Sequence, residues 1–137
     1  MKRYTTMAEH NEVGKIGEDL ARAFLMKQGF TILDTNYRIL QGELDIVAKK
    51  DSKIHFVEVK SIKVRDFSNL NSLAVRPEDN LTYGKYSKLV ITIDSYLKSR
   101  GVPHETRYQL DLACVYINLE TREGRVRLMQ NILIEQN

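Results

Sequence analysis

The sequence contains two carboxylates and a lysine at a spacing that would allow the carboxylates to bind a metal ion and the lysine to approach a phosphate. Asp45 lies in one alternating apolar segment, and Glu58-Val59-Lys60 ends the next one. Two carboxylates on neighbouring strands repel each other unless a proton or a cation lies between them. Carboxylate oxygens, with the Val59 carbonyl and water, suit Mg²⁺ or Mn²⁺. Lys60 would then orient or deprotonate the attacking water, or stabilise charge on a phosphate.

A solvent-exposed strand face is the structural alternative for the same residues. In that interpretation Glu58 and Lys60 pair with charges on a neighbouring antiparallel strand. Ile54 and Phe56 share their face, because side chains alternate along a strand, and both are too apolar for a face that meets only water. The pattern therefore favours a buried strand that opens into a cleft.

A predicted β-hairpin brings the two acidic positions together. Its strands cover 43–48 and 54–60, and the charged turn between them has Asp51 and Ser52 at its tip. Alternation places Asp45 on the opposite face from three apolar residues of the first strand, which are Leu44, Ile46 and Ala48.

The rest of the chain is predicted to form two helices and three more strands. Apolar residues at three- and four-residue steps predict helices over 11–27 and 81–100, each followed by a glycine. The other predicted segments are a strand over 30–33, a turn over 34–36, a long polar connection over 61–80, and strands over 108–119 and 124–129. The order α-β-β-β-α-β-β predicts an α/β sandwich with a central mixed sheet flanked by helices.

Length and composition predict a single cytoplasmic domain. The 137 residues suit one domain over 11–137, after a polar and flexible N-terminus over 1–10. No apolar run approaches the roughly 20 residues that span a bilayer, so no membrane is expected. The single cysteine, Cys114, excludes an intramolecular disulfide and any zinc site that needs two thiolates. It lies among apolar residues and is expected to be buried and inert.

The charge balance permits a nucleic-acid partner without requiring one, since 21 basic residues face 18 acidic residues and the net charge is +3. An acidic site that accepts DNA needs basic residues around it. We expect that rim to comprise Lys60 with Lys63, Arg65, Arg76, Lys85 and Lys88. The alternative for Lys85 and Lys88 is an ordinary exposed helix face.

Several motifs together resemble the bacterial YraN-like family from about Asn11 to Leu119. These are Gly17-Glu18-x-x-Ala21, Gly42-Glu43-Leu44-Asp45-Ile46-Val47, Phe56-Val57-Glu58-Val59-Lys60, Lys85-x-x-Lys88-Leu89 and Asp111. The resemblance implies a restriction-endonuclease-like fold, similar to archaeal Holliday-junction resolvases. It also implies a metal-dependent phosphodiesterase site of the type D…ExK.

The resemblance assigns roles to four residues. Asp45 and Glu58 would be the metal carboxylates, Lys60 the catalytic lysine, and Glu18 an additional acid of the site. Glu18 has a structural alternative, because a helical ion pair with Arg22 would also explain it. Two positions depart from the family pattern: Ile62 and Gln109 stand where many relatives carry basic residues.

The expected function is that of a Mg²⁺-dependent nuclease acting on DNA, with branched or structured DNA as a candidate substrate. Relatives that resolve four-way junctions act as symmetric dimers, so a homodimer is one expectation. The alternative is a nucleic-acid-binding or protein-interaction module that keeps the fold without turnover, because fold does not fix function. His55 is expected to be a packing or strand-surface residue.

Overall fold

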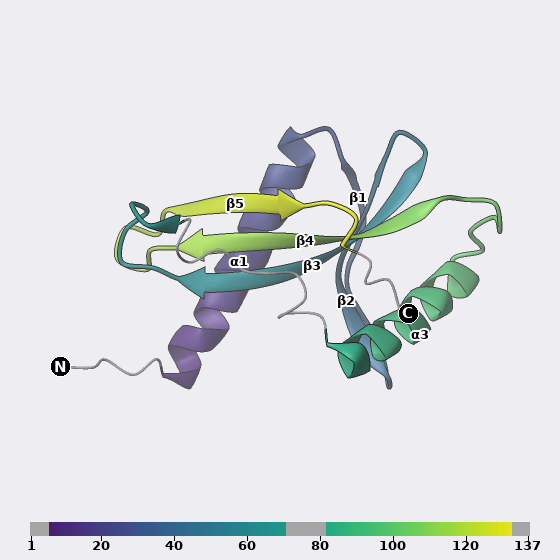
Figure 1. Ribbon diagram of the computed structural model, residues 1–137, viewed down its shortest axis with the longest axis horizontal. Coiled ribbons are helices and arrows are strands. Elements are labelled where there is room, and N and C mark those ends of the chain that lie inside the picture. The colour runs from purple at the N-terminus through teal and green to yellow at the C-terminus, as the bar shows by residue number, and fades with distance from the viewer. Residues whose placement is uncertain (1–5, 71–81, 133–137) are drawn as a thin grey trace.

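The computed structural model describes residues 6–70 and 82–132, and the elements within them follow the predicted order. They form an α/β fold with a five-stranded mixed sheet and two helices, which confirms the predicted α/β class. The elements are α1 (Met7–Lys27), β1 (Thr31–Ile39), β2 (Gly42–Lys50), β3 (Lys53–Lys63), α3 (Tyr83–Ser99), β4 (Tyr108–Ile117) and β5 (Gly124–Met129) (Figure 1).

The strands lie side by side in chain order, β1-β2-β3-β4-β5. The pairs β1–β2, β2–β3 and β4–β5 are antiparallel, so the predicted hairpin is confirmed. Only β3 and β4 are parallel, because the chain between them crosses over through α3. This topology places β3, which carries Glu58, in the middle of the sheet.

Helix α1 begins at Met7, four residues before the start that the apolar pattern predicts. The reason is a polar N-cap, since the Thr6 side chain accepts a hydrogen bond from the Glu9 backbone N–H at 3.1 Å. The helix ends at Lys27, and Gly29 follows with φ 93°. The buried residues of α1 are four positions apart, namely Val13, Gly17, Ala21 and Leu25.

Strand β1 contradicts the predicted turn over 34–36, because it continues from Thr31 to Ile39. The polar residues are absorbed by a register shift between Ile32 and Asp34 and by a positive φ of 52° at Asn36. The Asp34 carboxylate also accepts a hydrogen bond from the Tyr96 hydroxyl of α3 at 2.6 Å. The Asp34 side chain thus has its hydrogen-bond partner in α3, whereas in a local turn it would bond to the neighbouring backbone.

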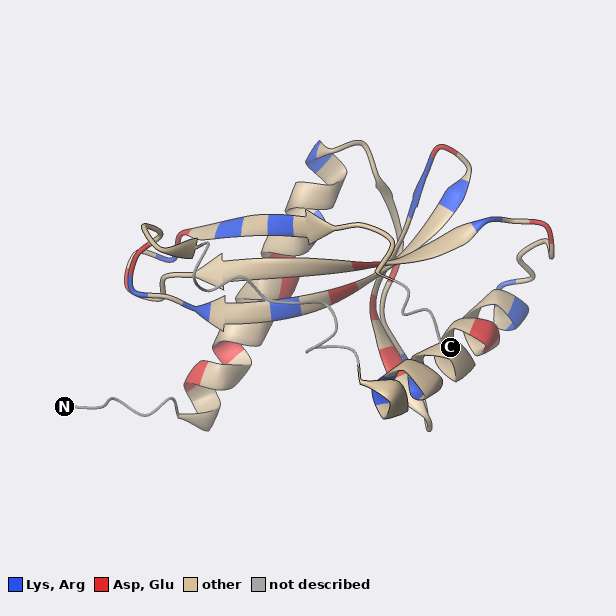
Figure 2. Cartoon of the chain, in the orientation of Figure 1, with Lys and Arg blue, Asp and Glu red and all other residues tan. Residues whose placement is uncertain are grey.

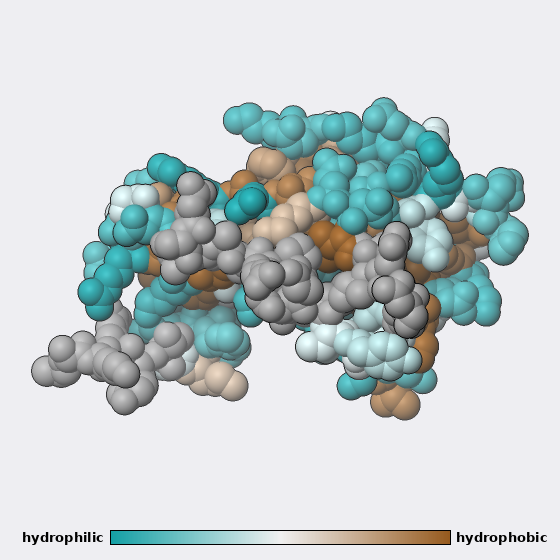
Figure 3. All heavy atoms as spheres, viewed as in Figure 1, coloured by the Kyte–Doolittle hydropathy of each residue, from teal (hydrophilic) through white to brown (hydrophobic). Residues whose placement is uncertain are grey.

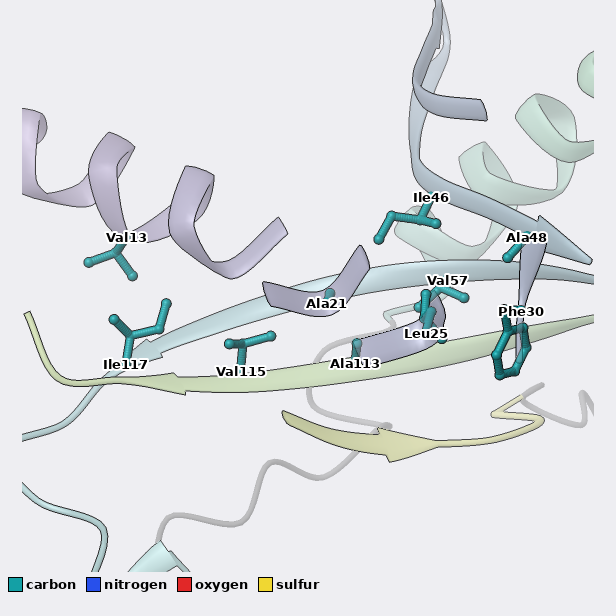
Figure 4. Packing of buried hydrophobic residues seen from close by; sticks show 10 residues of the cluster. All are labelled: Val13, Ala21, Leu25, Phe30, Ile46, Ala48, Val57, Ala113, Val115 and Ile117. Carbon is teal, nitrogen blue, oxygen red and sulfur yellow. The ribbon is translucent and has the colours of Figure 1, made fainter. Parts of the chain in front are cut away.

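The two helices cover opposite faces of the sheet (Figure 1). Residues Val57 and Phe56 alternate along β3, and Val57 packs in the α1 cluster whereas Phe56 packs in the α3 cluster. Figure 4 shows the α1 cluster, whose members are Val13, Ala21, Leu25, Phe30, Ile46, Ala48, Val57, Ala113, Val115 and Ile117.

Strand β2 contributes side chains to both helix clusters, and Val47 packs in the α3 cluster. Ile46 and Ala48 join the α1 cluster, but Leu44 packs in the α3 cluster beside its strand partner Tyr37. The predicted common face therefore holds for Ile46 and Ala48 and is wrong for Leu44. Pairing between β2 and β3 extends only from Ile46 to Lys50, so the first half of β2 is free to follow β1 away from β3.

Of the segment predicted as a connection over 61–80, residues 61–70 are described, and they contain regular structure. Strand β3 continues to Lys63, and the Val64 N–H donates to the Ile117 carbonyl at 2.8 Å. Phe67 and Leu70 pack against the cluster around Leu112. Among the described residues, no helix has the length and apolar character needed to cross a bilayer. Hydrophilic side chains cover much of the described surface in Figure 3.

Candidate metal and nucleic-acid site

Asp45 lies at the fork where β2 separates from β3. The last residue pair of the β2–β3 ladder is Ile46 with Val57, and Asp45 is one residue beyond it. The Val59 backbone N–H donates a hydrogen bond to Asp45 Oδ2 at 2.8 Å. The carboxylate therefore holds the two strands together at the point where their backbone pairing stops.

Glu58 is the second carboxyl group at this fork, and its side chain is buried, with a relative exposure of 9%. The Asp45 backbone N–H donates to its carboxyl group, but Glu58 Oε1 has no hydrogen-bond partner among the described residues. Burial raises the pKa of Glu58 to about 8, and the negative charge of Asp45 acts in the same direction. A buried carboxyl oxygen without a partner is uncommon and calls for an explanation.

The Asp45 carboxyl group is also easier to protonate than an ordinary aspartate. Burial raises its pKa to about 6, and the charges of Glu18 and Glu43 add to this increase. The Val59 N–H and the charge of Lys85 oppose the increase. Four acidic groups therefore interact here: Asp45 acts on Glu58, Glu18 acts on Asp45, and Glu43 acts on both Asp45 and Glu58.

Glu18 and Asp45 line one cavity of about 180 Å³ between α1 and the β1–β2 ribbon. The predicted alternative for Glu18, an ion pair with Arg22, is not what the structure has. Arg22 instead binds Asp19, with Nη2 and Oδ1 2.6 Å apart. Glu18 thus remains an acid that faces the Asp45 cavity.

Lys60 is exposed and lies beside Cys114 of β4 in the sheet register. Within the described part of the chain it makes no hydrogen bond or ion pair to Asp45 or Glu58. Lys85, in the first turn of α3, provides positive charge that lowers the pKa of both carboxyl groups. The structure thus brings Asp45, Glu58, Glu18 and the charge of Lys85 together, while Lys60 stands at the exposed edge of this group.

The site offers a hard divalent cation two carboxylates, Asp45 and Glu58. Residues 6–70 and 82–132 contain no group of three or more His, Cys, Asp or Glu side chains that could hold a metal ion. Two carboxylates remain, and one of their oxygens has no partner. Mg²⁺ in proteins is commonly held by one or two carboxylates, with water and substrate phosphates at the other positions. Asp45 and Glu58 fit that kind of site.

The basic residues expected around the site are spread over several elements. Lys63 Nζ lies 3.1 Å from Glu9 Oε2, and Arg65 is exposed two residues after the end of β3. Lys85 and Lys88 are exposed on the first two turns of α3. Arg76 lies outside the described residues. Figure 2 shows basic segments on β3, on β5 and at the beginning of α3.

Two features of the sheet were missed by sequence reasoning. Arg127 of β5 pairs with Cys114, which also pairs with Lys60, so the two basic residues flank the same β4 position. Burial raises the pKa of the Cys114 thiol, whereas the charges of Arg127 and Lys60 lower it. Regular alternation in 124–129 could have indicated a basic face, but not its register against Lys60.

The second missed feature is a buried polar network on β3 and β4. His55 Nδ1 lies 2.7 Å from Asp111 Oδ2, and Gln109 Nε2 donates to Asp111 Oδ1 at 2.7 Å. His55 also packs edge-on against Phe30. The expected packing role of His55 is therefore incomplete, because 56 residues of sequence separate it from its polar partner. Cys114 is buried as expected.

Sequence comparisons agree with the resemblance that the motifs indicate. The model of the uncharacterised protein family UPF0102, also called the YraN family, matches residues 17–115. A UPF0102 protein of Flavobacterium psychrophilum is 38% identical over 110 residues, which cover 80% of this chain and 85% of the relative. UPF0102 proteins of Campylobacter fetus and a Nitratiruptor species are 34% and 38% identical. Those matches cover 85% and 89% of this chain, and 88% and 93% of the relatives.

The matched region includes α1 from Gly17 onward, the acidic fork between β2 and β3, and most of β4. The chain belongs to the UPF0102 family.

Proposed function

We propose that this protein is a cytoplasmic, Mg²⁺- or Mn²⁺-dependent endonuclease of the restriction-endonuclease-like type that acts on DNA. Asp45 and Glu58 would hold the cation, and Glu18 would complete the acidic group from α1. The bound cation would activate water and stabilise charge on the scissile phosphate. The mixed sheet with a helix on each face is compatible with the sandwich of that fold.

The observation that carries this proposal is the state of the two carboxyl groups. Both pKa values are raised, and Glu58 Oε1 is buried without a partner among the described residues. Two adjacent carboxyl groups in this condition must share protons or accept a cation. Perturbed acids beside a cavity are more frequent at functional sites than elsewhere.

The remaining residues would bind and orient DNA. Lys85 lies close enough to both carboxyl groups to lower their pKa values, so its ammonium group would sit beside a phosphate at the site. Lys60 stands on the same strand two residues beyond Glu58 and would approach the phosphate from the exposed side. Lys63, Arg65 and Lys88 would contact more distant phosphates, which makes binding salt-sensitive. A four-way junction would need a homodimer, since two strands must be cut.

Calorimetric titration with Mg²⁺ and Mn²⁺ tests the cation site directly. We expect saturable binding by the wild-type protein and none by the double variant Asp45→Asn/Glu58→Gln. Glu43→Gln is the matched control, because it removes an acid of β2 that is already paired with Arg38 at 2.9 Å. It should retain cation binding.

Nuclease assays on branched, flapped and single-stranded DNA then test the activity. Cleavage in Mg²⁺ should disappear in Asp45→Asn and in Glu58→Gln, and persist in Glu43→Gln. If Asp45→Asn cleaved DNA as fast as the wild-type protein, the assignment of the site would be wrong.

A second candidate function is DNA binding without turnover. It is favoured by the absence of a third metal-ligating side chain near the pair within the described residues. This function requires DNA binding that persists in EDTA, together with no cleavage of any substrate in Mg²⁺ or Mn²⁺. The same two assays therefore distinguish the candidates.

A further inference from the structure

A second cavity, of about 250 Å³, opens where the β2–β3 turn meets the beginnings of β3 and β4. Its lining includes Phe30, Lys53, His55, Arg107 and Gln109. None of its lining residues belongs to the cavity that contains Asp45 and Glu18. Since a water molecule occupies about 30 Å³ in the liquid, this partly open cavity has room for a polyatomic ligand with its own water.

The inner wall of the cavity contains a histidine whose orientation is fixed by a buried carboxylate. Asp111 is 0% exposed, and its Oδ1 accepts hydrogen bonds from Gln109 Nε2 at 2.7 Å and from the Asn131 backbone N–H at 2.9 Å. Its Oδ2 lies 2.7 Å from His55 Nδ1. Because a carboxylate only accepts hydrogen bonds, Nδ1 carries a proton and donates it to Asp111.

The other ring nitrogen of His55 is available to a ligand. His55 lines the cavity, and Nε2 has no hydrogen-bond partner among the described residues. Nε2 is not fully enclosed by protein atoms, so a ligand in the cavity can reach it. Nε2 can therefore form a hydrogen bond with a ligand oxygen, while the Nδ1–H···Asp111 bond holds the ring in place.

The rim of the cavity is basic. Lys53 and Arg107 both line it, and neither forms an ion pair with any described residue. Lys50 also lines it, but its ammonium group donates to the Gln28 carbonyl at 2.8 Å and lies over the Phe30 ring. Asp51 is the one acidic side chain among the described residues that line the cavity. The charge around the opening is thus positive, with two cations free to turn toward a ligand.

We propose that this cavity binds a phosphate group. Arg107 and Lys53 contact its charged oxygens, and His55 Nε2 forms a hydrogen bond to one oxygen from the inner wall of the cavity. Guanidinium and ammonium groups suit this geometry, because an anionic tetrahedral group offers several acceptors in different directions. The phosphate belongs either to a small phosphorylated compound or to a nucleic-acid end. This proposal does not depend on the Asp45–Glu58 cation site.

Calorimetric titration of the full chain with inorganic phosphate tests the pocket. The titration is done in EDTA, with ionic strength held constant by sodium chloride, so that the carboxylate site and general screening do not contribute. We expect saturable binding that is at least about tenfold weaker in Arg107→Ala and in Lys53→Ala. Lys49→Ala removes the same charge from an exposed β2 residue outside the lining and should leave the affinity within about twofold.

An NMR measurement on the same samples reports on His55. Its imidazole Cε1–H resonance should shift with phosphate in proportion to saturation, and the shift should vanish in the Arg107→Ala/Lys53→Ala double variant. The proposal is overturned if the wild-type protein shows no saturable binding. It is also overturned if Lys49→Ala weakens binding as much as Arg107→Ala, or if the His55 resonance does not respond.

Two oligonucleotides of one sequence, with and without a 5′-phosphate, distinguish the sources of the ligand. Tighter binding of the phosphorylated strand, lost in Arg107→Ala, identifies a nucleic-acid end. Equal binding of the two strands, together with saturable inorganic phosphate, identifies a small phosphorylated compound. Both results are consistent with a phosphate-binding cavity. Neither measurement depends on DNA cleavage. Loss of the phosphate-binding proposal would therefore leave the endonuclease proposal unaffected, and loss of the endonuclease proposal would leave the phosphate-binding proposal unaffected.

Discussion

The Val59 backbone N–H donates to Asp45 Oδ2 at 2.8 Å, across the gap that opens where β2 leaves β3. The hydrogen bond fixes the Asp45 side chain against β3, the strand that carries Glu58. In return the Asp45 backbone N–H donates to the Glu58 carboxyl group. Beyond Ile46 the backbone pairing of β2 with β3 stops, and two contacts between a backbone N–H and a carboxyl group connect the strands instead. These contacts position both acids at the fork.

The stability of the cation-free protein should fall as pH rises from about 4.5 to about 8. The pKa of Glu58 is raised to about 8 in the folded state, so the folded protein binds more protons than the unfolded chain in this interval. Stability therefore decreases with rising pH until Glu58 is deprotonated. Urea denaturation at several pH values measures the slope.

Glu58→Gln should flatten that slope and raise the free energy of unfolding at pH 8 by roughly 1–3 kcal/mol, because an unpaired buried charge is removed. Glu43→Gln should retain most of the slope, since the charge of Glu43 only adds to a rise in the Glu58 pKa that comes chiefly from burial. Equal pH profiles for wild type and Glu58→Gln would contradict the raised pKa.

Millimolar Mg²⁺ should raise the melting temperature more at pH 8 than at pH 5. A cation binds the deprotonated carboxylates and stabilises the folded state by mass action, whereas protons compete with it at low pH. Differential scanning fluorimetry with and without EDTA measures the change. Asp45→Asn/Glu58→Gln should abolish the effect, and an undiminished response in that variant would place the cation elsewhere.

Lys85→Ala should raise the pKa values of both Asp45 and Glu58. The ammonium group of Lys85 favours the charged form of each carboxyl group, so its removal makes both easier to protonate. Carboxyl ¹³C NMR titration of the two side chains measures the shift. Lys88→Ala is the matched control from the next turn of α3 and should change these values less.

Gly17→Ala should destabilise the protein by about 1–3 kcal/mol. A Cβ at Gly17 would overlap the Ser61 hydroxyl and lie 2.9 Å from Ser61 Cβ, so α1 would have to move away from β3. Gly14→Ala is the control, because a Cβ there meets nothing within 4 Å, and it should stabilise by roughly 0.5–1 kcal/mol. Denaturation of both variants, and of Gly17→Ala with Ser61→Gly as partial rescue, tests the contact.

The sequence by itself determined the elements with strong periodicity and the pairing of the acidic positions. Alternation in 43–48 and 54–60, with a short charged turn between them, leaves a hairpin as the simplest structure, and the hairpin brings Asp45 to Glu58. The helix over Met7–Lys27 was predicted except for its first turn, where the Thr6 cap extends it. These features depend on neighbours in the chain.

Only the tertiary structure decided where strands bend and which distant residues meet. The polar residues 34–36 remain in β1 because Tyr96 of α3 donates to Asp34, and Leu44 turns toward α3 because β2 leaves β3. His55 meets Asp111 through the parallel register of β3 and β4 across a crossover, a register that no local pattern encodes. The position of Lys85 beside the acids likewise follows from how α3 packs, because helix packing is set by the whole apolar face.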